Sequence, residues 1–193
     1  MTTFNSNRPE RNLDRQQQSW LRQARKAGYF IALIGYGTAA QAQIAGQICT
    51  DAQTGTTKVS LQPAANGTVI DISNSLQWSA CNLGEVWQRG QCSGDPKHLS
   101  VGSANSESRN SQLAGFGDWR LPTLDELQTL SSNRCYLPAA DLTLFPTTLS
   151  THYWSADRFQ LFAWSVGFDF GEPVAMPLNY KRPVRLVRTL PTP

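Results

Sequence analysis

One stretch of the chain combines a helical spacing of hydrophobic residues with a full set of helix-start signals. Leu124, Leu127 and Leu130 are spaced so that they share one face of a helix. Thr123 and Glu126 form a Thr-x-x-Glu capping box, in which each side chain accepts a backbone N–H at the helix start. The pattern therefore predicts a short helix that begins directly after Thr123.

The residues before this helix are typical of an extended segment that ends at a fixed turn. Trp119 and Leu121 lie two positions apart, so they share one face of an extended chain while Arg120 points the other way. Pro122 fixes its own φ and keeps Leu121 out of the helical region. We interpret the following residues as structural rather than catalytic: Trp119, Arg120, Pro122, Thr123 and Glu126.

Alternation with a period of two predicts strands on both sides of the helix. Residues 68–72 and 76–78 flank Ser73-Asn74-Ser75 and predict a hairpin. Residues 161–169 also alternate, and residues 174–176 are expected to return antiparallel to them. One face of the alternating segment carries Phe162, Trp164, Val166 and Phe168.

The remaining segments carry weaker patterns. Residues 43–65 are polar and predict an irregular lead-in, whereas residues 183–188 are β-prone. Residues 97–113 are rich in Ser, Asn and Gly, and both a helix and a surface loop fit them. Short strands, two modest helices and long loops together predict an α+β domain with a short antiparallel sheet over residues 66–190.

The N-terminal region has the pattern of a secretory signal. Residues 1–28 are polar and basic, residues 29–40 are apolar, and Ala40-Gln41-Ala42 matches a small-x-small cleavage site. The apolar run is shorter than the roughly 20 residues that span a bilayer. We therefore expect residues 1–42 to be removed on export, so that the mature chain begins at Gln43. The alternative is a retained membrane anchor formed by the apolar run.

Removal of this segment changes the charge of the protein. The whole chain has 17 Lys and Arg against 14 Asp and Glu, a formal net charge of +3. Six of the basic and two of the acidic residues lie before residue 43, which leaves 11 and 12 in the mature part. The mature domain is therefore close to neutral, and its charge gives no support for nucleic-acid binding.

All four cysteines lie after the expected cleavage site. An even number of cysteines in an exported chain indicates two disulfides, and four cysteines allow three pairings. Cys81 and Cys92 flank a segment that can form a short hairpin about Arg89-Gly90, and pairing them would leave Cys49 with Cys135. The chain has only two histidines and no Cys-x-x-Cys spacing, so a zinc site is poorly supported.

An ordered series of motifs resembles the Lcl C-terminal domain family, which is named after the C-terminal module of a bacterial collagen-like adhesin. The motifs are Gly67-Thr68-Val69-x-Asp71, Leu76-x-Trp78, Cys81…Trp87…Cys92, Gly117-Asp118-Trp119-Arg120-Leu121-Pro122-Thr123 with Glu126-Leu127, Cys135-Tyr136, Tyr153-Trp154-Ser155, Ala163-Trp164-Ser165-Val166-x-Phe168 and Val184-Arg185-Leu186-Val187-Arg188. The resemblance covers about residues 49–190.

The resemblance implies a C-type-lectin-like fold, a secreted or cell-envelope location and a non-enzymatic role in binding or adhesion. The family's pattern also implies the Cys49–Cys135 pair. In the adhesin, the module trimerises and binds sulfated glycosaminoglycans, which implies a polyanionic glycan as partner. The chain contains no collagen repeat, so a homotrimer is left open, and residues 93–114 lack the aromatic helical pattern expected of the family.

The densest group of basic residues in the mature chain is the candidate ligand-binding surface. It comprises Tyr180, Lys181, Arg182 and Arg185, with Arg158 expected nearby. Arginine forks beside an aromatic ring suit sulfate, carboxylate or sugar ligands. Alternation about Val184 predicts that Arg185 faces solvent. The competing interpretation is that these are ordinary strand-edge charges that discourage aggregation.

No metal or cofactor is expected. Calcium-dependent lectins use Glu-Pro-Asn and Trp-Asn-Asp segments, but here Glu172-Pro173 is followed by Val174 and no Trp-Asn-Asp occurs. Asp157, Asp169 and Glu172 carry the oxygen ligands that calcium needs, yet solvated turn residues are the simpler interpretation.

Two other functions compete with a binding module. Residues 119–123 also resemble segments of formylglycine-generating enzymes, whose chemistry depends on reactive, copper-binding cysteines. The four cysteines here are better explained as structural, and neither His98 nor His152 has a recognisable catalytic partner in the sequence. The other alternative is a pilus or surface-assembly subunit held by an uncleaved apolar segment.

Overall fold

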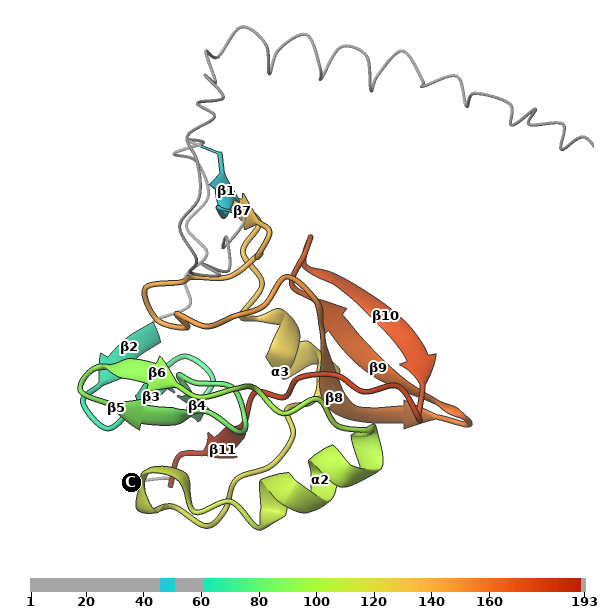
Figure 1. Cartoon of the computed structure of the whole chain (residues 1–193), viewed down its shortest axis with the longest axis horizontal. Coiled ribbons are helices and arrows are strands. Elements are labelled where there is room, and N and C mark those ends of the chain that lie inside the picture. Colours follow the sequence, from blue (N-terminus) through green and yellow to red (C-terminus); the bar gives the residue numbers. More distant parts are fainter. Residues whose placement is uncertain (1–45, 51–60, 192–193) are drawn as a thin grey trace, which may run out of the picture. The chain divides into compact units, whose positions relative to one another are not determined.

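The computed structural model describes residues 46–50 and 61–191, which form a single unit of short strands, two helices and long connections (Figure 1). The expected signal, residues 1–42, lies outside the described residues. Within the part of the chain that the structure describes, no helix has the length and apolar character needed to cross a membrane.

A four-stranded antiparallel sheet with the strand order β11-β4-β3-β2 forms one half of the domain. Its centre is the predicted hairpin of β3 (Thr68–Asp71) and β4 (Leu76–Ser79), in which Val69 pairs with Trp78. The Asp71 carboxylate accepts hydrogen bonds from the backbone and side chain of Asn74, which fixes the turn. The outer strands are β2 (Leu61–Ala64) and β11 (Val187–Thr189).

A second, three-stranded antiparallel sheet is built from β8 (His152–Phe159), β9 (Phe162–Gly167) and β10 (Glu172–Pro177). The predicted alternation along β9 is present, but burial does not follow it. Ala163 and Ser165 are buried, as are Val166 and Phe168, while Phe162 and Trp164 are exposed. Both faces of β9 are therefore buried around Ser165 and Val166. Towards the β8–β9 turn, the face that carries Phe162 and Trp164 is exposed to solvent.

The hairpin predicted between Cys81 and Cys92 is formed by β5 (Val86–Gln88) and β6 (Gln91–Ser93). Arg89 and Gly90 both have positive φ, at 51° and 81°, as a two-residue hairpin turn requires. The Trp87 ring lies against the backbone of Gly67, where an added Cβ would come within 2.3 Å of the ring. Glycine at position 67 is therefore a condition for docking this hairpin on the sheet.

Both expected helices are present. Helix α3 (Leu124–Gln128) begins at the predicted capping box, because Glu126 N donates to Thr123 Oγ1 and Thr123 N donates to Glu126 Oε2. The segment for which helix and loop both fitted contains α2 (Val101–Arg109), capped by Ser100. Its buried residues Val101, Ala104 and Ser108 form a narrow stripe, so tertiary packing rather than local sequence stabilises it.

The capping box of α3 includes an ion pair that should make stability depend on pH. Arg120 donates to both carboxylate oxygens of Glu126, each at 2.7 Å. Burial alone raises the pKa of Glu126, but the hydrogen bonds from Arg120 and Thr123 outweigh it and lower this pKa below its ordinary value of 4.5. A carboxyl whose pKa is lower in the folded state stabilises the fold above its unfolded-state pKa, and this stabilisation is lost as pH falls through the folded-state pKa.

We therefore expect the melting temperature of the parent protein to fall more steeply below pH 4.5 than that of Glu126→Gln, which has no carboxylate to protonate. The difference at neutral pH should correspond to about 1 kcal/mol, since the pair is partly exposed to solvent. Thermal melts of both proteins from pH 3 to pH 7 test this. Parallel curves for the two proteins would show that Glu126 titrates alike in the folded and unfolded states.

The lead-in is more ordered than expected. β1 (Ile48–Cys49) pairs antiparallel with β7 (Cys135–Tyr136), and β2 lies at residues 61–64, so the prediction of a wholly irregular segment over residues 43–65 is wrong. The structure has disulfides between Cys49 and Cys135 and between Cys81 and Cys92, the pairs expected from the sequence. The first closes a loop across 86 positions, which contributes about 4 kcal/mol on the chain-entropy model.

Two hydrophobic clusters form the core. The first joins β3 and β4 to α3 and includes Trp78, Leu127, Tyr153 and Phe168. The second joins α2 to β8 and includes Trp119 and Trp154. The prediction of an α+β fold with short antiparallel sheets, two helices and two disulfides is confirmed.

Candidate ligand-binding surface

The candidate residues Tyr180, Lys181, Arg182 and Arg185 do not form one surface. Tyr180 and Lys181 are exposed and Arg182 is half-buried, but only 1% of Arg185 is accessible to solvent. The prediction that Arg185 faces solvent and binds ligand is therefore wrong. Its neighbours Val184 and Leu186 do share the opposite face, in the second cluster, as the alternation requires.

The face to which Arg185 points is covered by other parts of the chain. Its Nη1 donates to the carbonyls of Ser79 and Ala80, at 2.9 and 2.6 Å, and its Nη2 donates to Asn82 Oδ1 and Thr148 Oγ1. The Phe145 ring lies 4.6 Å from the guanidinium carbon. These contacts make Arg185 a structural cation at the junction of three segments that are distant in sequence.

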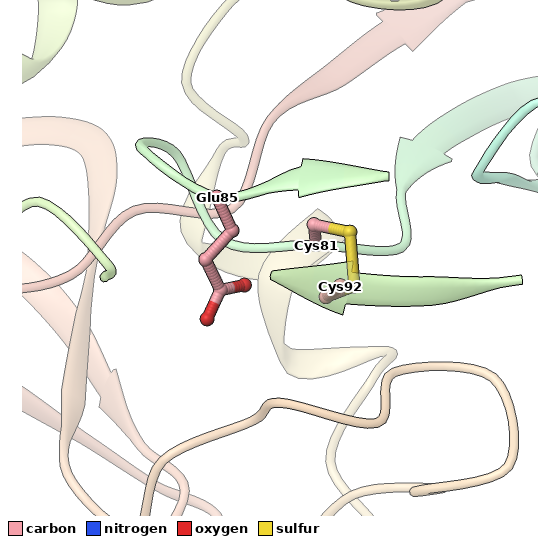
Figure 2. A group of neighbouring side chains, drawn as sticks. All are labelled: Cys81, Glu85 and Cys92. Atoms are coloured by element: carbon pink, nitrogen blue, oxygen red, sulfur yellow. A yellow bond between two sulfur atoms is a disulfide. The ribbon is translucent and has the colours of Figure 1, made fainter. Parts of the chain in front are cut away.

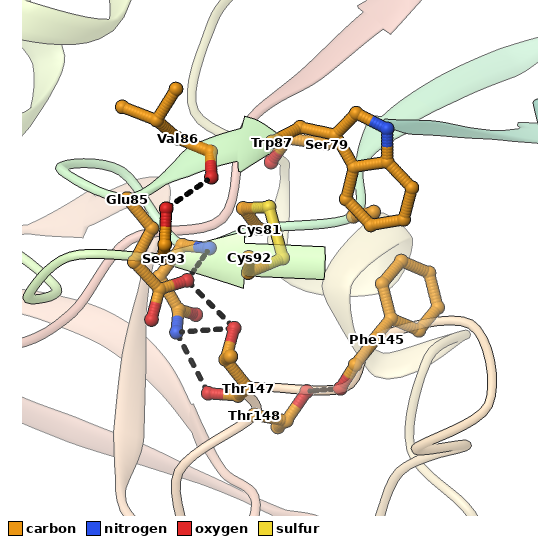
Figure 3. The surroundings of a disulfide bond; sticks show 12 residues. Ser79, Cys81, Glu85, Val86, Trp87, Cys92, Ser93, Phe145, Thr147 and Thr148 are labelled. Atoms are coloured by element: carbon orange, nitrogen blue, oxygen red, sulfur yellow. Dashed lines mark hydrogen bonds between the residues drawn. A yellow bond between two sulfur atoms is a disulfide. The ribbon is translucent and has the colours of Figure 1, made fainter. Parts of the chain in front are cut away.

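Burial has opposite effects on the two ionisable groups at this junction. It lowers the pKa of Arg185, while nearby Tyr153 and Glu85 favour the charged form. Burial raises the pKa of Tyr153, whose hydroxyl donates to Asn82 Oδ1 at 2.8 Å. Glu85 Oε2 accepts hydrogen bonds from Asn82 N and Thr147 Oγ1, and Figure 3 shows Thr147 facing this carboxylate beside the Cys81–Cys92 bridge. The cluster is hydrogen-bonded internally and stabilises the fold.

The other candidate residues and Arg158 lie beside the start of α2. The backbone of Arg182 pairs with Leu99, and Arg158 Nη2 donates to the carbonyl of Val101. The guanidinium of Arg182 lies 5.5 Å from the centre of the Tyr180 ring. We define Tyr180, Lys181, Arg182 and Arg158 as the basic surface. The basic surface thus contains three of the four predicted ligand residues, together with Arg158, which was expected nearby.

Sequence reasoning did not identify the turn between β8 and β9 as a surface of interest. Residues 159–162, Phe-Gln-Leu-Phe, form this turn, and three of them are large hydrophobic side chains left in solvent. We call these four residues the hairpin tip. The signal available in the sequence was the absence of the glycine, asparagine or aspartate that usually occupies a tight turn.

Among the residues that the structure describes, Cys81, Glu85 and Cys92 are the one group whose ligand atoms lie close enough together to suggest a metal site. Figure 2 shows, however, that the two sulfurs are joined in a disulfide. A disulfide sulfur has no thiolate to offer a metal, and the Glu85 carboxylate already binds Asn82 and Thr147. This group is therefore structural.

The acidic residues considered as calcium ligands have other contacts. The carboxylate of Asp157 accepts the backbone N–H of Leu124 at the start of α3. Asp169 Oδ1 accepts the N–H of Phe170, and Glu172 is exposed at the beginning of β10. Asp157 thus binds the first residue of α3 at one end of β8, whereas Asp169 and Glu172 lie in the turn at the other end of β8.

His152 has neighbours that the sequence did not reveal. Its Nδ1 lies 3.5 Å from Ser165 Oγ, and His152 and Asp169 both lie over Gly167. Burial lowers the pKa of His152, and Asp169 opposes this effect. Ser165 is buried, however, and its hydroxyl donates to the carbonyl of Val174 at 2.7 Å. This arrangement does not present an accessible nucleophile.

A pocket of about 490 Å³ lies beside the paired strands β1 and β7, next to the Cys49–Cys135 bridge. Gln47 Nε2 donates to the carbonyls of Pro138 and Ala140, and Asp141 Oδ1 accepts from Thr143, while the exposed Arg134 side chain also lines the pocket. The pocket therefore presents one cationic side chain, whereas the basic surface groups three.

Comparison with known protein families identifies the family of this chain. Residues 67–188 match the family described as the Lcl C-terminal domain, and this range is more than half of the chain. It runs from the start of β3 into β11 and includes both core clusters, the basic surface and the hairpin tip. No curated protein matches the chain.

Proposed function

We propose that this chain, which belongs to the Lcl C-terminal domain family, is an exported, non-enzymatic binding module that recognises sulfated or acidic glycans through its basic surface. Membership of the family indicates a surface or extracellular module. The finer proposal, including the C-type-lectin-like fold and a place in the cell envelope, rests on the resemblance and on the chemistry of the basic surface.

The observation that carries the proposal is the grouping of Arg158, Lys181 and Arg182 around the start of α2. Both arginines contact the segment from Leu99 to Val101, although they are 24 positions apart. Helix α2 has no acidic residue in its first turn, so its N-terminal dipole adds to the positive potential there. Arginine guanidinium groups bind sulfate and carboxylate oxygens in a bidentate manner, and the Tyr180 ring provides an apolar face for a sugar.

The same domain presents no free thiol for the enzymatic alternative, since all four cysteines form disulfides. We therefore favour the hypothesis of a binding module over that of an enzyme of the formylglycine-generating type. A homotrimer is part of the proposal, because three linked copies of the basic surface would bind a repeating polyanion with higher avidity than one copy.

Replacement of Lys181 and Arg182 by alanine should weaken heparin binding by about tenfold, because each side chain supplies a charge-assisted contact. The effect should shrink at high salt, where the Debye length falls from about 10 Å at 0.1 M to about 3 Å at 1 M. Heparin retention in a salt gradient measures both effects. Arg185 is left unchanged, since its replacement would disrupt the fold.

The matched control replaces Arg109 and Arg134, which are exposed arginines elsewhere on the domain. This variant loses the same formal charge, so it separates a local site from net charge. Equal retention of the two variants, or no retention of the parent protein at low salt, would contradict the glycan proposal. Circular dichroism of all three proteins establishes that they are equally folded.

A further inference from the structure

The hairpin tip exposes more apolar surface than any requirement of the fold explains. The exposed fractions are 64% for Phe159, 75% for Leu161 and 42% for Phe162. Phe159 and Phe162 form the last cross-strand pair before the turn, and Phe162 also pairs with Pro177 on β10. The apolar side chains are therefore contiguous at one end of the sheet, where the turn projects from the domain (Figure 1).

The sequence of this turn is unfavourable for a solvent-exposed hairpin. Two-residue turns favour glycine, asparagine or aspartate, because one or both positions need positive φ. Here Gln160 adopts a φ of 52° and Leu161 occupies the most exposed position. Contiguous exposed apolar residues of this kind mark interaction sites in soluble domains.

The surroundings of the tip are cationic. Leu178 N donates to the carbonyl of Leu161, which brings residues 176–182 beside the turn. Residues 158–163 and 176–182 together contain Arg158, Lys181 and Arg182 and no acidic residue. Asp157, the nearest acidic residue in sequence, is bound to the backbone of α3. The exposed apolar side chains of the hairpin tip therefore have basic and aromatic side chains beside them.

We propose that the hairpin tip inserts into the surface of an anionic phospholipid bilayer. A narrow turn with leucine at its end and phenylalanine on either side is suited to the outer acyl region, about 5–10 Å deep. Tyr180 suits the headgroup level, where amphipathic aromatic rings gather. Lys181, Arg182 and Arg158 then face the lipid phosphates, because basic side chains are attracted to an anionic membrane surface.

A bilayer fits this shape better than a second protein does. A stable protein interface buries about 800 Å² on each partner and draws on 20–30 residues, whereas the tip consists of a two-residue turn and its flanking pair. Its positive surroundings also disfavour contact between two copies of the same tip. This membrane contact goes beyond the proposed glycan binding, with which it shares only the basic residues.

The test uses the expected mature chain from Gln43 and vesicles of phosphatidylcholine with and without phosphatidylglycerol. Phe159→Ser combined with Leu161→Ser should weaken partition to the anionic vesicles by tenfold or more, since both substitutions remove apolar surface that the bilayer would bury. Ile72→Ser combined with Val86→Ser is the matched control, because both residues are exposed apolar side chains away from the tip. This control should bind as the parent does.

A reporter variant locates the contact. Leu161→Trp should be quenched by brominated phosphatidylglycerol in the vesicles, whereas Ile72→Trp should show no added quenching. Absence of parent binding to anionic vesicles, equal binding by the tip variant and the parent, or equal loss in the tip variant and the control would each overturn the proposal. So would sedimentation showing that the tip mediates self-association instead. Unchanged heparin retention by the tip variant would show that glycan binding is a separate property.

Discussion

Replacement of Arg185 by methionine is expected to lower the free energy of unfolding by about 3–5 kcal/mol, which is a large part of the stability of a domain this size. Methionine has a comparable length but no donors, so it leaves the carbonyls of Ser79 and Ala80 and the side chains of Asn82 and Thr148 without their partner. It also leaves the buried carboxylate of Glu85 without a nearby positive charge.

Chemical denaturation of the two proteins at neutral pH measures this loss. Lys181→Met is the matched control, since it makes the same substitution at an exposed position four residues away. The control should change stability by less than about 0.5 kcal/mol. Arg185→Met with a stability within 1 kcal/mol of the parent would show that the hydrogen-bonded junction contributes little.

Replacement of Trp119 by alanine is expected to cost about 3–5 kcal/mol through the cavity that it leaves. The indole is 1% exposed and lies in the second cluster with residues of α2, β8 and the segment containing Val184 and Leu186. Its Nε1 donates to the carbonyl of Leu113 at 2.9 Å, and Phe116 packs edge-on against it. The structure thus places this ring in the core and not on a sugar-binding surface.

Trp164→Ala provides the comparison, because this indole is 36% exposed on the outer part of β9. Its loss should cost about 1 kcal/mol, in the range of an ordinary substitution. Melting curves of both variants, together with heparin retention, distinguish the two roles. A Trp119→Ala protein that kept its stability and lost ligand binding would assign this ring to the ligand site.

Local features of the domain are predictable from the sequence because the interacting groups lie close together in the chain. The capping box of Thr123 and Glu126 and the ion pair with Arg120 fall within seven residues. The turn at Arg89-Gly90 and the hairpin of β3 and β4 likewise depend on neighbouring residues. Their geometry follows from backbone preferences that each residue carries with it.

The role of Arg185 is not predictable in this way. Alternation correctly separates it from Val184 and Leu186, but whether the opposite face meets solvent depends on residues 37 to 106 positions away. The same limit applies to β9, where one face is buried at Val166 and exposed at Phe162. Periodicity assigns side chains to faces, whereas burial depends on which distant segment covers each face.

The location of residues 184–187 determines when this domain can fold. Val184 and Leu186 complete the second cluster, and Val187 completes the first while pairing with both Trp78 on β4 and Arg120. During synthesis, neither cluster is therefore complete until residues 184–187 have been made. Completion of both clusters requires contacts between segments that are distant in sequence, and such contacts slow folding. Before residues 184–187 are in place, the apolar residues of both clusters lack part of their cover, and exposed apolar surface of this kind favours aggregation.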